Sequence, residues 1–157
     1  MWTALLAKEA DPGLDVLILE GDRIAEGASG RNGGFMDSSL THGFSNGFAR
    51  WRRELPTLLA LGLKNLKEIE ETLERYNIDC DYIRTGDIDM ATEPHHIEEM
   101  KKEMEEAAPF NTNFQFMERD EVQAVVKSPI FIAGLKKPDS ARVNPAHLAW
   151  GLLKACL

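Results

Sequence analysis

The segment VLILEGDRIAEGASGRNGGF, residues 16–35, decides which fold we expect this chain to adopt. With the two residues before it, its apolar start reads LDVLILE, which has the length and composition of a strand buried on both faces of a parallel sheet. Residues 2–10 have the apolar spacing of a short helix, and Asp-Pro-Gly at 11–13 ends it. Helix, tight turn and buried strand make up the second half of a βαβ unit, so the sequence predicts an α/β fold.

Glu20 stands at the end of this expected strand. An acidic side chain at that place in a βαβ unit accepts hydrogen bonds from the ribose of a bound dinucleotide. In the usual fingerprint it follows the glycines of GxGxxG by about 20 residues, which would place those glycines at or before Met1. The alternative interpretation is that Glu20 only ends a strand and meets solvent.

The stretch after Glu20 is rich in glycine, with six glycines from Gly27 to Gly47. We expect a functional loop there, because so many glycines disfavour a regular element. Backbone amides beside glycine can approach a pyrophosphate closely, while Ser29 offers a hydroxyl and Arg31 a charged guanidinium. No Lys-Ser or Lys-Thr follows a GxxxxG spacing, so this is not a Walker loop for nucleotide hydrolysis. A surface ion pair is the alternative role for Arg31.

The rest of the chain alternates between helical and strand patterns. Asn144 and Pro145 are typical of an N-cap and a first helical position, and Pro56 is expected to kink a long helix or mark its start. The expected elements are helices over 48–76, 94–108, 119–127 and 144–156, a β-hairpin over 80–92, and strands over 114–118 and 130–135.

Composition limits the partners that this chain is expected to have. A net charge of −8 argues against binding to nucleic acid or to anionic membranes, and no apolar run reaches the length of a membrane span. Cys80 and Cys156 form no CxxC pair, so we expect reduced thiols in a cytoplasmic protein. His95 and His96 lack the HExxH spacing and point apart on a helix, so no metal site is expected.

The run VLILEGDRIAEGASGRNGG closely resembles flavin-dependent oxidoreductases of the D-amino-acid oxidase and glycine oxidase superfamily. It is most similar to the branch that includes gamma-glutamylputrescine oxidoreductases. MWTALLAKE resembles the tail of the helix that follows the glycine fingerprint in that branch. YIRTGDIDMA resembles the strand pair that begins the substrate domain, and LKKPDSARVNPAHLAWGLLKA resembles the return to the cofactor domain.

This resemblance implies a fragment of a Rossmann-like FAD-binding domain together with the start of an α+β substrate domain. By the resemblance, residues 1–76 form a partial FAD-binding domain without its first strand and GxGxxG. Residues 77–135 form a partial substrate domain, and residues 136–157 return to the FAD-binding domain. We therefore expect the chain to cover less than half of a typical family member, truncated at both ends.

The resemblance also implies FAD as the cofactor and a small-molecule amine or amino acid as the substrate. The flavin would accept a hydride from the carbon that bears the amino group; no catalytic residue is assigned. The alternative is a truncated, non-catalytic chain that acts as an association or folding partner, with self-association through an exposed sheet edge. Glu20 would bind the adenosine ribose, and the side of the cofactor that carries the pyrophosphate and flavin would be lined by Ser29, Gly30, Arg31, Asn32, Gly33 and Gly34.

Overall fold

The computed structural model describes residues 1–157, and the chain divides into two compact units. Unit one comprises residues 1–36, 67–83 and 142–157, and unit two comprises residues 37–66 and 84–141. Three elements contribute residues to both units: the long helix α3 (Leu55–Arg75) and the paired strands β1 (Phe35–Asp37) and β5 (Ser140–Arg142).

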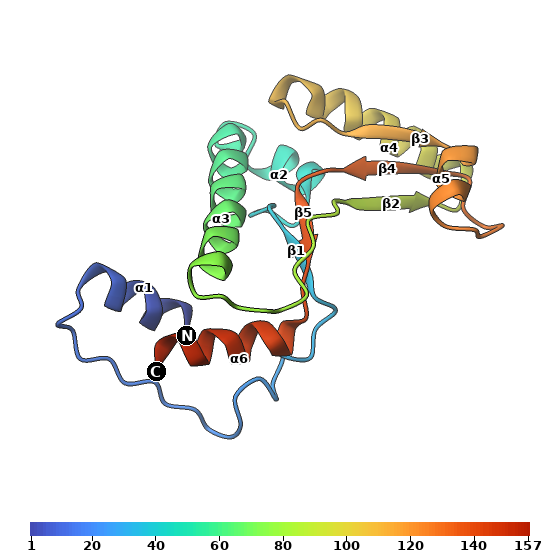
Figure 1. The fold of residues 1–157 in the computed structure, drawn as a ribbon. Coiled ribbons are helices and arrows are strands. Elements are labelled where there is room, and N and C mark those ends of the chain that lie inside the picture. Colours follow the sequence, from blue (N-terminus) through green and yellow to red (C-terminus); the bar gives the residue numbers. More distant parts are fainter. The chain divides into compact units, whose positions relative to one another are not determined.

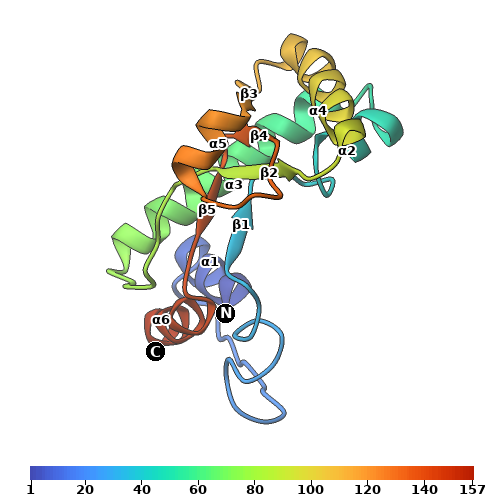
Figure 2. The same ribbon diagram turned by 90° about the vertical axis from the view of Figure 1, so that its right-hand side faces the viewer.

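Two helices of unit one, α1 (Trp2–Ala10) and α6 (Pro145–Cys156), lie side by side (Figure 1 and Figure 2). The start of α6 confirms the prediction from the sequence. The Asn144 side chain accepts a hydrogen bond from the amide of His147 at 3.2 Å, and Pro145 takes a first-turn position. The buried side chains that form the core of this unit are Leu5, Leu73, Ile78, Cys80, Val143 and Leu152.

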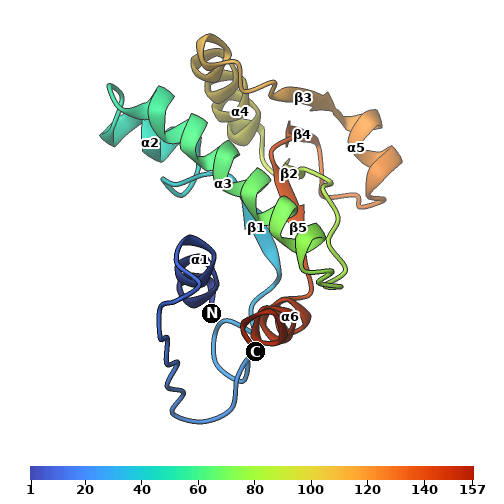
Figure 3. The ribbon, with the colours of Figure 1, turned by 60° about the vertical axis from the view of Figure 1, so that its left-hand side comes forward.

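The strand predicted over residues 14–20 is wrong, because no β-ladder forms there. Figure 3 shows residues 11–34 as irregular chain between α1 and β1. Leu17 and Leu19 are 80% and 85% exposed, and even Leu14 and Ile18, which line a cavity beside α1, are 43% and 40% exposed. The segment is therefore extended chain on the surface and not a strand buried on both faces. A ladder needs a neighbouring strand to accept its hydrogen bonds, and no strand of the chain pairs with residues 14–20.

Unit two contains an antiparallel sheet of three strands in the order β2 (Asp87–Ala91), β4 (Ala133–Lys137) and β3 (Gln115–Glu118). Two helices contact it: α4 (Pro94–Ala107) and α5 (Arg119–Val125). A short 3-10 helix η1 (Ala108–Phe110) follows α4, and α2 (Phe44–Arg50) precedes α3. Phe44, Leu55 and Ala107 are the buried centre of a cluster that is completed by Phe48, Leu59, Phe110 and Phe114.

The hairpin predicted over residues 80–92 is also wrong. Its second half is β2, but that strand pairs with β4, with Asp87 opposite Lys137 and Ala91 opposite Ala133. Ile83 instead forms an isolated bridge with Arg142. Thr85-Gly86, a pair that favours a turn, leads here into a strand whose partner lies far along the chain.

The remaining helices follow local sequence signals. The region predicted as one helix over 48–76 forms two helices. Pro56 lies at the start of the longer one, α3, which confirms the prediction that this proline marks a helix start. α4 begins with Pro94 in its first turn, after Glu93. The ring of His96 completes this cap, because its Nδ1 accepts the backbone amide of Glu93 at 3.3 Å.

Candidate functional site

Glu20 lies on the surface in a tight bend that its own carboxylate closes. Oε1 accepts the backbone amide of Gly21 at 2.8 Å and that of Asp22 at 3.3 Å. Both bonds use the same oxygen, and the side chain is exposed. Oε2 is therefore left as an acceptor for hydroxyl groups outside the chain, which is the chemistry that a ribose requires.

Asn32 ties the predicted pyrophosphate segment into one bend. Its side-chain nitrogen donates to the carbonyl of Ala28 at 3.1 Å and to the carbonyl of Ser29 at 3.0 Å. Its side-chain oxygen accepts the amide of Gly34 at 2.9 Å. The structure thus brings Ser29, Asn32 and Gly34 together, and it gives Asn32 a structural role that the sequence interpretation did not foresee.

Arg31 projects from this bend and is 69% exposed along its side chain. One guanidinium nitrogen lies 3.5 Å from the Glu26 carboxylate, which is the surface ion pair considered as the alternative. An exposed pair of this kind contributes about 0–1 kcal/mol to stability. The contact is therefore weak enough for Arg31 to exchange it for a phosphate group, which the guanidinium binds in a bidentate manner.

Gly34 is required at its position by backbone geometry. Its φ is +74°, and a Cβ there would lie 2.1 Å from the carbonyl oxygen of Val143. Gly30 is similarly confined, because a Cβ would lie 1.9 Å from the Ala25 carbonyl oxygen. The sequence suggested that these two glycines let the backbone approach a cofactor. In the structure they let the backbone pack closely against other segments of the same chain. Gly33 is exposed, and an added Cβ would meet only the ring of Phe35.

The predicted site residues therefore form two groups within unit one. Ser29 to Gly34 share one bend, and Glu20 closes another, with no hydrogen bond or ion pair between the two. Their polar groups suit an adenine dinucleotide: an exposed carboxylate with a free oxygen, and an exposed guanidinium with small residues on either side of it. This fit concerns chemistry and exposure, and the assignment of these residues to a cofactor stays a prediction.

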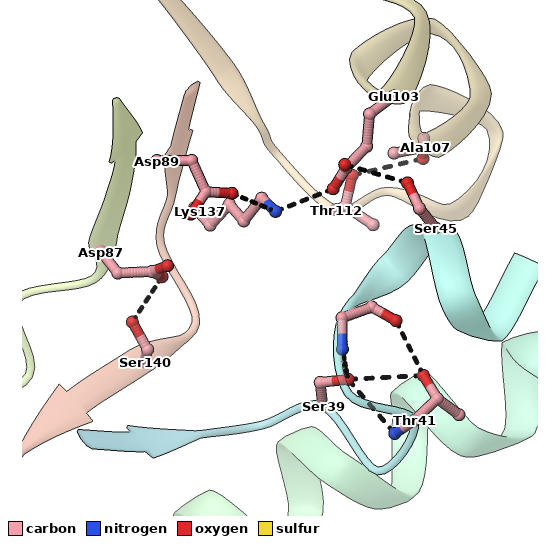
Figure 4. Close-up of polar contacts among 11 residues, drawn as sticks. Ser39, Thr41, Ser45, Asp87, Asp89, Glu103, Ala107, Thr112, Lys137 and Ser140 are labelled. Atoms are coloured by element: carbon pink, nitrogen blue, oxygen red, sulfur yellow. Dashed lines mark hydrogen bonds and ion pairs between the residues drawn. The ribbon is translucent and has the colours of Figure 1, made fainter. Parts of the chain in front are cut away.

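Unit two contains a second polar group that sequence reasoning missed (Figure 4). The ammonium of Lys137 lies 2.7 Å from Asp89 Oδ2 and 2.8 Å from Glu103 Oε1. Both contacts are ion pairs. Burial lowers the pKa of Lys137, but the two carboxylates together outweigh it and raise the pKa above its usual value.

Asp87 lies beside this group on the same face of β2 as Asp89. The hydroxyl of Ser140 donates to its Oδ1 at 2.7 Å. Burial raises the pKa of Asp87, and the charges of Asp89 and Asp37 raise it further, whereas the bond from Ser140 and the charge of Lys137 lower it. All these residues except Ser140 line a cavity of about 550 Å³ in unit two.

The histidines occupy ordinary positions at the surface or at helix starts. His42, in a left-handed conformation with φ of +56°, is exposed at the edge of the unit-two cavity. His147 lies 3.5 Å from Asp81 in unit one, and His96 caps α4. No three His, Cys, Asp or Glu side chains are grouped to hold a metal ion. None of the helices combines the length and apolar character that crossing a membrane requires.

Comparison with known proteins places the chain among flavin enzymes. The profile of the DAO family, described as "FAD dependent oxidoreductase", matches residues 1–157. "Probable oxidoreductase OrdL" from Haemophilus influenzae is 29% identical over 156 residues, covering 94% of this chain and 35% of that protein. Gamma-glutamylputrescine oxidoreductase from Escherichia coli is 27% identical over 144 residues, covering 90% of this chain and 34% of that protein.

The fold is also that of solved members of this group. Glycine oxidase from Bacillus cereus superimposes with a TM-score of 0.67 at 20% identity, over 98% of this chain and 40% of that one. Identity at this level shows the fold alone. The chain thus has the α/β character predicted from its sequence, and it spans about a third of the length of the curated relatives that it matches.

Proposed function

Because the chain belongs to the DAO family of FAD-dependent oxidoreductases, we propose that it serves the oxidation of the CH–NH group of an amine or amino acid. The observation that carries this proposal is the family match over residues 1–157, which includes both predicted cofactor groups of unit one. A curated relative supports the substrate class, since it is named as a gamma-glutamylputrescine oxidoreductase.

In this proposal the two groups of unit one hold different parts of FAD. Glu20 accepts hydrogen bonds from the adenosine ribose through Oε2. Arg31 exchanges Glu26 for the pyrophosphate, whose negative charge it offsets. Ser29, Gly30, Asn32, Gly33 and Gly34 supply the hydroxyl, the amides and the lack of bulk that let the backbone approach. When bound, FAD supplies the hydride acceptor that turns the amino-bearing carbon into an imine, which water hydrolyses.

We assign the parts of the chain accordingly. Residues 1–76 and 136–157 belong to the cofactor domain, and residues 77–135 begin the substrate domain. The two free cysteines, Cys80 and Cys156, agree with a reducing compartment such as the cytoplasm. The partner is a small molecule, since the net charge of −8 disfavours nucleic acid.

The visible spectrum of the purified chain tests this proposal. The chain is mixed with FAD, desalted, and then given amines or amino acids in the absence of oxygen. Retained flavin absorbance that bleaches with one of these substrates supports the oxidoreductase. A colourless protein after desalting contradicts flavin binding, and retained flavin that no amine bleaches contradicts the proposed reaction.

A second candidate function rests on the exposed segment before Glu20. Leu17 and Leu19 are 80% and 85% exposed, and the backbone around them has no strand partner. An extended apolar segment with free amides and carbonyls pairs readily with another strand. The alternative is therefore a non-catalytic chain that associates with itself or with a folding partner here. A strictly monomeric chain at high concentration would contradict self-association through this segment.

A further inference from the structure

Residues 15–33, which contain most of the residues assigned to the cofactor, are joined to the rest of unit one by a single hydrogen bond. The indole Nε1–H of Trp150, on α6, donates to the backbone carbonyl of Ile24 at 3.4 Å. Every other hydrogen bond and ion pair of residues 15–33 lies within residues 20–34. Apart from the two chain connections, this bond is therefore the polar link that fixes the segment to α6.

The link joins the segment close to the bend that carries Arg31. Ile24, Ala25 and Gly30 are half-buried, whereas the other residues from 21 to 33 are exposed. Gly30 packs directly on Ala25, because a Cβ at Gly30 would lie 1.9 Å from the Ala25 carbonyl oxygen. Since Ala25 follows Ile24 and Gly30 precedes Arg31, the position of Ile24 is passed on to the bend through one close contact.

Helix α6 offers a firm base for this link. Asn144 caps its start, and Gly151 lets it lie close to Ile78, since a Cβ at Gly151 would lie 2.3 Å from Cγ2 of Ile78. The ring of His147, one turn before Trp150, lies 5.9 Å from the indole ring. Trp150 itself is 52% exposed, so it adds little to the core, and the N–H of its indole can only donate. The bond to Ile24 is therefore its main contribution.

We propose that Trp150 is a positioning residue for the cofactor, which holds Ile24 and thereby orders the bend around Arg31 before FAD binds. This inference rests on the proposed function, because the bend is assigned to FAD only there. It extends the assignment to a residue 126 positions further along the chain than Ile24, with no motif in common. A bend ordered in advance loses less conformational freedom on binding, so loss of the link weakens binding without removing a contact to FAD.

Trp150→Phe tests this role, because phenylalanine keeps an aromatic ring beside His147 and removes the N–H. Trp51→Phe is the matched control, since Trp51 is 42% exposed, lies in unit two and makes no indole hydrogen bond. FAD affinity is measured by quenching of flavin fluorescence, and stability by urea unfolding. Hydrogen exchange in the flavin-free chain is followed at the amides of Glu26, Gly30 and Arg31, which donate to carbonyls within the segment. NMR spectra follow the indole N–H signals.

We expect Trp150→Phe to bind FAD about two- to tenfold more weakly than the wild type, which corresponds to the loss of one neutral hydrogen bond. Trp51→Phe should bind it as the wild type does. Exchange at the three amides should quicken in Trp150→Phe, whereas its urea midpoint should stay that of the wild type, because residues 15–33 form no helix or strand. The indole signal of Trp150 should move when FAD is added to the wild type, and that of Trp51 should stay in place.

Equal FAD affinity in the wild-type and Trp150→Phe chains, or unchanged exchange at the three amides, would overturn this inference and leave the proposed function standing. A urea midpoint that falls together with the affinity would also overturn it, since Trp150 would then serve stability in general. Lack of FAD binding by the wild type would overturn the proposed function and the link to the cofactor together. The exchange result separates these cases, because it needs no flavin.

Discussion

Replacing Gly34 by alanine should destabilise the chain strongly. This glycine is predicted to line the cofactor site, but it also has a structural role in the fold. Its φ of +74° costs a residue with a Cβ about 1–2 kcal/mol. The added Cβ would also lie 2.1 Å from the Val143 carbonyl oxygen, next to the hydrogen bond of 2.9 Å from the Val143 amide to the Gly34 carbonyl. Moving the backbone to relieve this overlap costs about 1–3 kcal/mol more. Gly34→Ala should therefore lower the free energy of unfolding by roughly 2–5 kcal/mol.

Urea unfolding followed by circular dichroism measures this loss, and Gly21→Ala is the matched control. Gly21 has no positive φ, and an added Cβ would meet nothing within 4 Å. Its replacement should change the free energy of unfolding by less than about 1 kcal/mol, in the stabilising direction, because alanine restricts the unfolded chain. Equal free energies of unfolding for the two variants would refute the steric reasoning.

Three further changes test other parts of the structure. Lys137→Ala leaves two carboxylates without their cation and should lower the free energy of unfolding by about 1–3 kcal/mol. Lys67→Ala removes one partner of an exposed pair and should lower the free energy of unfolding by less than about 0.5 kcal/mol. Equal losses in the two variants would contradict this reasoning. The raised pKa of Asp87 means that its ionised form opposes folding, so Asp87→Asn should raise Tm at pH 7. That gain should vanish as the pH falls below the ordinary aspartate pKa, where the carboxyl is protonated in both states; a gain independent of pH would exclude this cause. Replacing Leu17 and Leu19 together by serine should reduce concentration-dependent association in light scattering, and an unchanged mass distribution would count against the alternative function.

The helices could be predicted because their signals are local. An N-cap such as Asn144 and a first-turn proline such as Pro94 act within one turn of the residues that they order. The strand predicted over 114–118 is confirmed as β3 (Gln115–Glu118), and the one predicted over 130–135 overlaps β4 (Ala133–Lys137). The pairing of strands could not be predicted in the same way, because each partner lies elsewhere in the chain. Asp87–Ala91 finds that partner more than 40 residues further along the chain, and residues 14–20 find none. Apolar composition at residues 14–20 and alternation at residues 87–91 indicated an extended chain, but neither carried information on pairing.

The candidate sites differ in the same way: local signals could be predicted from the sequence, and contacts between distant residues could not. The sequence indicated the bend from Ser29 to Gly34 because glycine, serine and asparagine mark such bends by their own chemistry. It gave no sign that Gly34 is confined by Val143, which lies over a hundred residues away. The cavity of unit two was missed for the same reason, since its charged residues come from separate elements. Only the spacing of Asp87 and Asp89, two acids on one face of an expected strand, hinted at it.

Binding of FAD to the chain, measured by quenching of flavin fluorescence, tests the central claim most directly. Arg23 and Arg31 each lie 3.5 Å from the Glu26 carboxylate and both are exposed, so their alanine variants form a matched pair. The wild-type chain should bind FAD, Arg31→Ala should bind it at least about tenfold more weakly, and Arg23→Ala should bind it as the wild type does. Absence of binding by the wild type, or equal affinity in all three proteins, would contradict the assignment of the bend around Arg31 to the cofactor.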